Sequence, residues 1–428
     1  MAKAMKTKAT YSKLGLPAFY LGNPLIEALP PILSPEALDA LLLSRPSTDL
    51  SEIRRLPSHA RVHAMADLDS LFVPRPELAT IESEISLLLR SGYLRRNPLL
   101  SSTMKETYSV RERMRRQGGL VSPLPPCLMV TALSGSGKSR SIRSILSLTP
   151  QVILHGNYAG RRLARTQITW LSLDAPINGS PRGLLLRAFS AVDRALNIKG
   201  SMSYVSQLGR SKTSVDQKIE EFAQIASTYN IGLLHIDDLQ RLTDGGNKQG
   251  ALVINMLIQL ANVVKVPLVF SGTHQMVRAL AGSLEAARRS SSGGIEDLPL
   301  PTNCDDPHFK LLVQALSAHQ YLDTPVEFDA VWRQKLFDLT LGLPAILISV
   351  VTQAQKMALR EGATCLDLSH LDRAFEKNCA LLKPALQALR GNDPNRFQSY
   401  EDLLPAKAQL EIEDALLFKA KRATSLAI

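Results

Sequence analysis

Short, continuously apolar runs alternate with amphipathic segments through the middle of the chain. Each run is five to seven residues long and lacks the every-second-residue alternation of a half-exposed strand. The intervening segments carry apolar residues at helical spacing, and Ser214 with Gln217 predicts a capping box on one helix. Strands that are buried on both faces and joined through helices form parallel sheets, so the pattern predicts an α/β domain. The predicted strands are 127–133, 151–155, 168–173, 231–236 and 266–271.

The segments on either side of this block predict mostly helices. Before residue 105, many prolines separate short helical patterns, and the best of these patterns places Gly92 as its C-terminal stop. The last part of the sequence is either a partner-docking peptide or a packed final helix. We therefore predict a proline-rich N-terminal arm with a small helical element (1–105), an α/β core (106–300), a helical lid (301–390) and a tail (391–428).

The segment TALSGSGKS (131–139) has the composition and context of a phosphate-binding loop. It follows a predicted strand and precedes a predicted helix, so backbone N–H groups and the positive helix end can surround a phosphate. Lys138 would neutralise the β- and γ-phosphates, and the Ser139 hydroxyl would hold Mg²⁺. Ala132 replaces the first glycine of the usual G-x-x-x-x-G-K-[ST] pattern. The predicted nucleotide-binding residues are Ser134, Gly135, Ser136, Gly137, Lys138, Ser139 and Arg140.

The segment IGLLHIDDLQ (231–240) has the form of a Walker B strand. Asp237 emerges at the end of the strand and would bind Mg²⁺ together with Ser139. Asp238 stands where a glutamate usually orients the attacking water. An aspartate is one methylene shorter, which sets its carboxylate back by roughly 1.5 Å, so we expect slow ATP hydrolysis that suits a switch. His235, inside the strand, is expected to be a packed core histidine.

Two further groups follow the strand at 266–271 and complete the predicted catalytic set. Thr273 or His274 would sense the γ-phosphate, the alternative being that they only cap the strand end. Arg288 or Arg289 would reach the nucleotide of a neighbouring subunit and neutralise its γ-phosphate. Two adjacent arginines before a loop are equally consistent with a solvated surface.

Composition and charge add a class of partner to this picture. The chain has 428 residues, of which 45% are hydrophobic and 21% charged, as in ordinary globular proteins. Its 50 Lys and Arg against 39 Asp and Glu give a net charge of +11, which favours nucleic acid or another polyanion. The four cysteines lie far apart, which excludes a disulfide scaffold and disfavours zinc. No apolar run of 18 residues and no signal-peptide pattern occur, so we expect a cytoplasmic protein without a membrane partner.

Two basic stretches are candidate DNA contacts. Arg161, Arg162 and Arg165 lie in a connection (160–167) that carries no acidic residue and that we predict as a loop or hairpin between two strands. Lys199, Arg210 and Lys212 form a second stretch. No base-reading motif is visible, so contacts would go to phosphates and be sensitive to salt but not to sequence. The alternative is that these charges only keep the surface soluble. Aromatic residues are only 5% of the chain and absent from the first stretch (160–167), which disfavours a base-stacking single-strand binder.

Together these motifs resemble the AAA+ ATPases and, within them, the TnsC/TniB transposition regulators related to MuB. The resembling segments are GYLRRNP (92–98), TALSGSGKSRSI, QVILHGNYAG with RTQITWLSLDAPINGSPRGLL, LLHIDDLQRL, LVFSGTH and DLTLGLPAILISVVTQA (338–354).

The resemblance implies an AAA+ P-loop core, with a parallel sheet sandwiched by helices, and an all-helical lid. It further implies a bacterial ATPase that uses ATP and Mg²⁺ and assembles with itself, as a ring or helical filament, on double-stranded DNA. Such a protein would recruit and activate a transposase and respond to a target-selection protein or guide complex. The sequence departs from the pattern at Ala132, at Asp238 and in the lid segment GLPAILISV, which lacks an arginine.

Two other functions are consistent with the same motifs. One is a helicase-like or clamp-loader-like AAA+ remodeller, whose product is mechanical work. The other is a monomeric P-loop signalling NTPase, which would need neither a basic inter-strand segment nor an arginine supplied by a neighbour. Asp238 favours a slow switch over a motor, but the residues alone do not exclude a loader.

Overall fold

The computed structural model describes residues 6–115, 127–177, 179–209, 213–242, 248–276 and 293–391, which form two compact units. We call Met1–Ser34, Thr80–Thr131 and Ile142–Asp297 the α/β unit, and Pro35–Ala79, Ala132–Ser141 and Leu298–Ile428 the helical unit. The first hundred residues therefore divide between the two units. The phosphate-binding loop belongs by its contacts to the helical unit.

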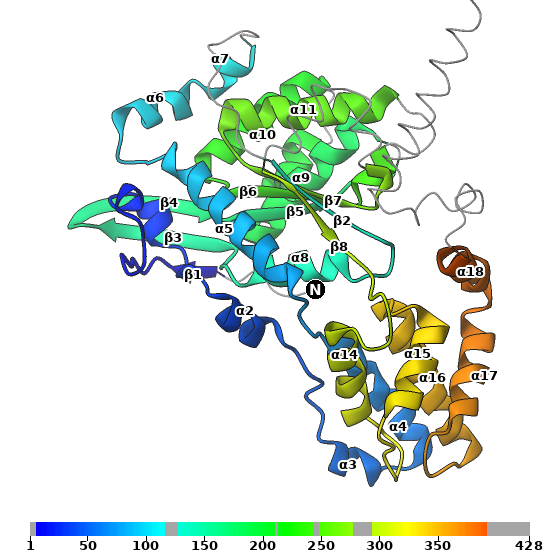
Figure 1. The fold of residues 1–428 in the computed structure, drawn as a ribbon. Coiled ribbons are helices and arrows are strands. Elements are labelled where there is room, and N and C mark those ends of the chain that lie inside the picture. The colour runs from blue at the N-terminus through cyan, green and yellow to red at the C-terminus, as the bar shows by residue number, and fades with distance from the viewer. Residues whose placement is uncertain are drawn as a thin grey trace, which may run out of the picture. The chain divides into compact units, whose positions relative to one another are not determined.

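A five-stranded sheet forms the centre of the α/β unit, in the order β5-β6-β7-β2-β8 (Figure 1). The pairs β5–β6, β6–β7 and β2–β7 are parallel, as the apolar runs predict. Every residue of β2, β6 and β7 is buried, which explains why these strands lack alternation. The bounds are β2 Cys127–Ala132, β5 Trp170–Asp174, β6 Leu233–Asp237, β7 Leu268–Gly272 and β8 Ile295–Leu298.

Helices cover both faces of this sheet, which is the α/β architecture that the sequence predicts (Figure 1). On one face, α9 (Pro181–Leu196), α10 (Val215–Thr228) and α11 (Lys248–Val264) pack against one another. On the other face lie α5 (Glu77–Leu94) and α8 (Lys138–Ser147). The placement of α8 opposite α9, α10 and α11 follows from right-handed crossovers, because the chain crosses the sheet from β2 to β5 through α8 and returns from β5 to β7 through the other three helices. The capping box predicted at Ser214 and Gln217 is present at the start of α10.

A second, three-stranded sheet in the α/β unit corrects one prediction and decides another that named two alternatives. The run 151–155 was expected in the central sheet, but it belongs to β3 (Val152–Tyr158) in a sheet of order β1-β3-β4. The connection 160–167 is largely a strand itself, β4 (Arg161–Ile168), which pairs antiparallel to β3. Ala159 and Gly160 join the two strands with φ of 47° and 76°, the two-residue hairpin geometry that matches strand twist. The third strand, β1 (Lys6–Lys8), runs parallel to β3.

Buried polar contacts hold this hairpin against the N-terminal segment. The His155 ring lies between the Tyr11 hydroxyl (2.9 Å) and Gln167 Oε1 (2.8 Å). The Tyr158 hydroxyl donates to Glu27 Oε2 at 2.9 Å, and Glu27 is 1% exposed. Burial and this carboxylate raise the pKa of Tyr158 to about 12. These contacts fix the small sheet to the rest of the unit.

The segment GYLRRNP joins α5 to the start of the central sheet. Gly92 does not stop the helix, which continues to Leu94; instead a Cβ on Gly92 would lie 2.7 Å from Pro267 Cδ. The Tyr93 hydroxyl donates to the Asn230 carbonyl at 2.9 Å, and the Arg96 guanidinium donates to the Ile231 carbonyl. The segment therefore closes backbone hydrogen bonds that would otherwise be missing where β6 begins. Further helices of the α/β unit are α1 Pro24–Glu27, α6 Ser101–Tyr108 and α7 Val110–Arg115.

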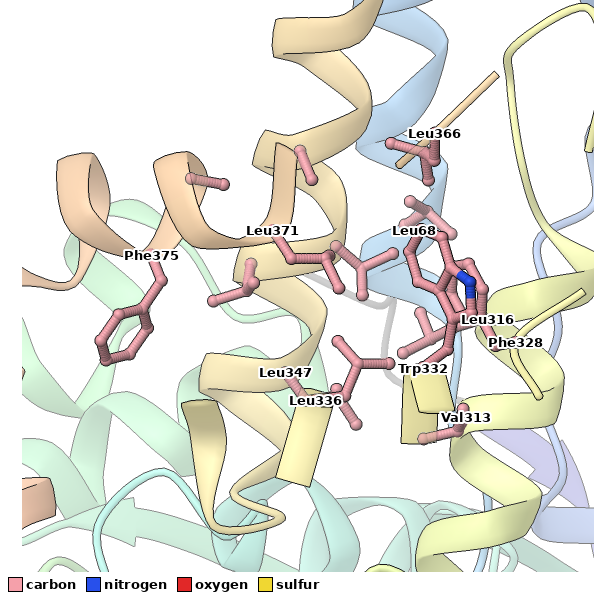
Figure 2. Close-up of a cluster of buried hydrophobic side chains, with 14 of the residues drawn as sticks. Leu68, Val313, Leu316, Phe328, Trp332, Leu336, Leu347, Leu366, Leu371 and Phe375 are labelled. Carbon is pink, nitrogen blue, oxygen red and sulfur yellow. The ribbon is translucent and has the colours of Figure 1, made fainter. Parts of the chain in front are cut away.

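The helical unit has a single apolar core (Figure 2). Trp332 stacks on Phe328 with ring centroids 4.8 Å apart, and Leu336, Leu347 and Leu371 are fully buried beside them. Leu133 of the phosphate-binding loop is part of the same core. The bounds are α2 Pro35–Leu42, α3 Leu50–Arg54, α4 Ser58–Ala64, α14 Pro307–Ala318, α15 Ala330–Thr340, α16 Pro344–Glu361, α17 Leu368–Asn378 and α18 Lys383–Gly391.

No single helix in the described part of the chain is long and apolar enough to cross a membrane. The helices α15 and α16, bent by 117°, pass a test of length and composition only as a pair.

Candidate nucleotide site and basic sheet

The loop between β2 and α8 has the backbone that phosphate binding requires. Gly135 and Gly137 have φ of 82° and 89°, a backbone conformation that residues other than glycine rarely adopt. Ser136 closes the turn, since its N–H and its hydroxyl both donate to the Leu133 carbonyl. Lys138 is the first residue of α8 and is buried, and Ser139 follows it in the first turn. Ala132 is the last residue of β2, fully buried, without a positive φ, so no glycine is needed there.

The lid helix α16 begins directly at this loop, within the helical unit. The N–H of Ala345, in the first turn of α16, donates to the Gly135 carbonyl at 3.2 Å. A Cβ on Gly135 would lie 3.6 Å from Ala345 Cβ. The lid segment GLPAILISV therefore contacts the phosphate-binding loop through a backbone hydrogen bond. This is the segment that lacks the arginine of the AAA+ sequence pattern.

Arg140, predicted as a nucleotide-binding residue, is directed to a different neighbour. Its Nη2 donates to the Ser70 carbonyl at 2.7 Å, and its guanidinium lies 5.3 Å from the centroid of the Phe72 ring. Burial lowers the pKa of this arginine. The contacts tie the first turn of α8 to the segment before α5.

Asp237 lies at the end of β6, as predicted, and is 1% exposed. Its Oδ1 accepts a hydrogen bond from the Ser271 hydroxyl at 2.7 Å. Its Oδ2 lies 3.2 Å from Nη2 of Arg143, and the same Nη2 lies 2.9 Å from Asp174. Asp174 stands directly opposite Asp237 in the β5–β6 register. Arg143 and Asp174 were not predicted, although two predicted strands that are each followed directly by an aspartate were a usable signal.

Asp238 adopts a left-handed backbone conformation, with φ of 56°. Its carboxylate lies 2.7 Å from Nη2 of Arg241 and accepts from Nε2 of Gln240 at 3.2 Å. Gln240 in turn accepts from the Thr273 N–H at 3.2 Å. The amide of Gln240 thus links the candidate water-orienting carboxylate to the end of the neighbouring strand β7.

Thr273 and His274 are both buried, and they have different neighbours. Thr273 is connected to Asp238 through Gln240. His274 Nε2 lies 2.9 Å from Oδ1 of Asp297, which also accepts from the Thr131 hydroxyl at 2.9 Å. Of the two predicted sensor residues, Thr273 is therefore the one joined by hydrogen bonds to the candidate water-orienting carboxylate. The predicted arginines Arg288 and Arg289 lie outside the described residues.

Exposed positive charge gathers on the small sheet. Arg161 and Arg162 are exposed at the tip of the hairpin, and Arg165 is half-buried, donating to Sδ of Met104 at 2.7 Å. The structure adds Lys6 and Lys8, exposed on β1, which the sequence analysis did not single out because a three-residue polar strand has no apolar signal. No acidic residue occurs in β1, β3 or β4. Lys199 is exposed elsewhere in the same unit, and Arg210 and Lys212 fall outside the described residues.

A parallel sheet with a glycine loop after β2 and a buried aspartate at the end of β6 defines a P-loop ATPase. Comparison with known families agrees, since residues 124–280 match the family model described as AAA domain. The chain thus contains an AAA domain, and this domain is an ATPase.

Comparisons with individual proteins are more distant. No curated protein matches the chain. A Walker-type ATPase of Pyrococcus abyssi is 16% identical, with 68% of this chain and 76% of that chain covered and a TM-score of 0.37. The ORC2 protein of Aeropyrum pernix is 10% identical, with 65% and 68% covered and a TM-score of 0.40. The RuvB Holliday junction branch migration motor of Thermotoga maritima is 13% identical, with 64% and 67% covered and a TM-score of 0.34.

Proposed function

We propose that this ATPase is a nucleotide-gated, sequence-nonspecific DNA-binding regulator that assembles with itself on duplex DNA and recruits and activates a transposase. The observation that carries the DNA-binding part is the exposed basic sheet on the ATPase domain. The transposition part, with a target-selection protein or guide complex as a further partner, is supported by the resemblance to TnsC/TniB proteins in the segments quoted above.

The residues present fit ATP and Mg²⁺. The two positive-φ glycines leave the loop backbone open to phosphate oxygens, and Lys138 brings a positive charge to them. The Ser139 hydroxyl and the Asp237 carboxylate are the oxygen ligands that Mg²⁺ prefers. Asp237 Oδ2 already lies 3.2 Å from a cation, the Arg143 guanidinium, so its surroundings accept positive charge. Bound Mg²⁺ would neutralise charge on the transferred phosphate.

In this proposal Asp238 orients the attacking water and sets the rate of hydrolysis. Its carboxylate is engaged by Arg241 and Gln240, and both contacts hold it in place. Asp238 is also one methylene shorter than the glutamate that usually stands at this position, so its carboxylate is set back from the attacking water. Slow hydrolysis follows, which suits a protein whose ATP-bound state is an assembled one. Arg288 or Arg289 of a neighbouring subunit would complete the site.

The small sheet favours duplex DNA over a single strand. Binding of single strands requires aromatic faces on which bases stack. The aromatic side chains of this sheet are used internally: Tyr158 is bonded to Glu27, Tyr11 is bonded to His155, and the two rings pack edge to face at 4.9 Å. The exposed tip carries two arginines, Arg161 and Arg162, which bind phosphates without reading bases.

The experiment that tests DNA binding removes the two tip arginines together, as Arg161→Ala with Arg162→Ala. Each phosphate contact contributes about 0.9 to the slope of log affinity against log salt concentration. We therefore expect a loss of roughly tenfold in duplex affinity at low salt and a slope smaller by about two. The measurement is fluorescence anisotropy with labelled duplex over a salt series, in the presence of a non-hydrolysable ATP analogue.

The matched control is Arg194→Ala, which removes an exposed arginine of α9 in the same unit. This control should change the slope of log affinity against log salt concentration by less than about 0.9, the contribution of one phosphate contact. Equal losses in the two variants would mean that only net charge matters, and an unchanged slope in the double variant would remove the sheet from the DNA interface.

A further inference from the structure

A chain of hydrogen bonds crosses three neighbouring strands inside the sheet and ends on Asp237. The Ser172 hydroxyl on β5 lies 2.9 Å from Nδ1 of His235 on β6. Nε2 of His235 lies 2.8 Å from the Ser271 hydroxyl on β7. Ser271 then donates to Oδ1 of Asp237 at 2.7 Å. His235 and Ser271 are both fully buried, which confirms the expectation that His235 is a core histidine.

The strand register explains why these side chains meet. Ser172 is opposite His235, and Asp174 is opposite Asp237, in the β5–β6 pairing. His235 and Asp237 are two residues apart on one strand, so they project from the same face of the sheet. The β6–β7 pairing places Val269 opposite His235. Two residues further along both strands, Ser271 is therefore opposite Asp237. The bonds are therefore a property of the sheet and not of a mobile loop.

The direction of each hydrogen bond in this chain can be assigned. An ionised carboxylate only accepts, so the single hydroxyl proton of Ser271 points to Asp237. The Ser271 oxygen then accepts from His235, which places the imidazole proton on Nε2. Nδ1 is consequently the acceptor, and it takes the proton donated by Ser172. One proton arrangement satisfies every member of the chain.

We propose that Ser271 and His235 are positioning residues for Asp237, an inference that rests on the proposed role of Asp237 as a magnesium ligand. Ser271 donates to Oδ1 at 2.7 Å, beside the Asp238 N–H at 3.0 Å, and opposes rotation of the carboxylate. Oδ2, which lies 3.2 Å from Nη2 of Arg143, is thereby kept in one orientation, in which it would hold the magnesium ion. His235 orients Ser271 by occupying its acceptor side, so that the hydroxyl proton has only Asp237 to bind. Burying polar groups in an otherwise apolar sheet costs free energy unless the groups are hydrogen-bonded. Here the hydrogen bonds form one chain that ends on the Asp237 carboxylate.

Two histidine substitutions separate this role from packing. In His235→Gln the side-chain amide nitrogen takes the place of Nε2 and can still donate to Ser271. In His235→Asn the amide is shorter, corresponds to the Nδ1 side and does not reach Ser271. Both variants lose the imidazole and should lower the Tm by similar amounts. Ser271→Ala removes the hydroxyl itself while leaving the strand packing almost unchanged.

The readout is equilibrium binding of a fluorescent ATP analogue to the full chain, in EDTA and in saturating Mg²⁺. The ratio of the two affinities reports how well the protein uses the metal, independently of turnover. We expect Ser271→Ala and His235→Asn to reduce this ratio about tenfold, with affinity in EDTA unchanged. His235→Gln should retain most of the ratio. A ratio that falls equally in both histidine variants, or in neither, would overturn the proposal.

Asp237→Asn separates failure of this inference from failure of the proposed site. If that substitution leaves the magnesium ratio intact, Asp237 is not the metal carboxylate and the proposed site itself is wrong. If Asp237→Asn abolishes the ratio while Ser271→Ala and His235→Asn preserve it, only the positioning role is wrong. A double variant Ser271→Ala with His235→Asn should be no worse than Ser271→Ala alone, because both act through the same bond.

Discussion

Two glycines and one alanine show how the phosphate-binding loop depends on backbone conformation at single residues. Gly135 and Gly137 have positive φ, whereas Ala132 ends a buried strand in an ordinary extended conformation. The consensus glycine at position 132 is therefore dispensable in this protein, and the two later glycines are not. The deviation from the motif lies where the fold tolerates it.

This difference predicts opposite outcomes for two substitutions. Gly137→Ala forces a side chain into left-handed backbone, which costs about 1–2 kcal/mol in the loop, and we expect at least a tenfold loss of ATP affinity. Ala132→Gly should leave ATP affinity unchanged and lower the free energy of unfolding by about 0.5–1 kcal/mol. Isothermal titration with ATP and urea unfolding measure the two quantities. Equal ATP affinity in both variants would contradict the assignment of the loop.

At the scale of elements, the fold was predictable where burial on both faces leaves a continuous apolar run. Such runs predicted the strands β2, β6 and β7. The amphipathic segments between the runs predicted the helices α9, α10 and α11. The strand β4 was predicted only as a loop or hairpin, because its sequence, RRLARTQI, mixes arginines with few apolar residues and its turn is Ala-Gly. The strand β1 has no apolar residue at all.

The candidate site was predictable only where a local sequence signal fixes the position of a residue. Lys138 and Asp237 stand at fixed spacings from local signals, a glycine loop and the end of an apolar strand. The contacts of Arg143 with Asp174 and of Ser271 with Asp237 depend on which strands are neighbours and in what register. No local pattern carries that information.

The hairpin β3–β4 also predicts a dependence of stability on pH. Burial lowers the pKa of His155 below its usual 6.5, and the nearby Arg165 acts in the same direction. The folded state then binds fewer protons than the unfolded state below pH 6.5, so stability is present at neutral pH and declines as pH falls. Between pH 7 and pH 5, the free energy of unfolding should therefore fall less in His155→Gln than in the unsubstituted protein. The two decreases should differ by up to about 1 kcal/mol.

Urea unfolding at several pH values checks this prediction. Lys335→Gln, which leaves His155 untouched, is a suitable control for a general effect of charge. Parallel curves for His155→Gln and the unsubstituted protein would show that the imidazole is protonated equally in both states.

At the scale of the whole molecule, a small basic sheet is a weak binder unless it is repeated. Arg161 and Arg162 with Lys6 and Lys8 offer few phosphate contacts per subunit, and each contact contributes modestly at physiological salt. Subunits held in an array would add their contacts through effective concentration, so that assembly and DNA binding strengthen each other. Nucleotide that stabilises the array would thereby gate DNA binding.

Light scattering of the full chain tests this coupling most directly, with and without duplex DNA, under ADP and under a non-hydrolysable ATP analogue. The proposal predicts growth in mass only when the analogue and the duplex are present together, and no growth for Lys138→Ala. A monomer under all four conditions, or equal growth with ADP, would contradict nucleotide-gated assembly on DNA.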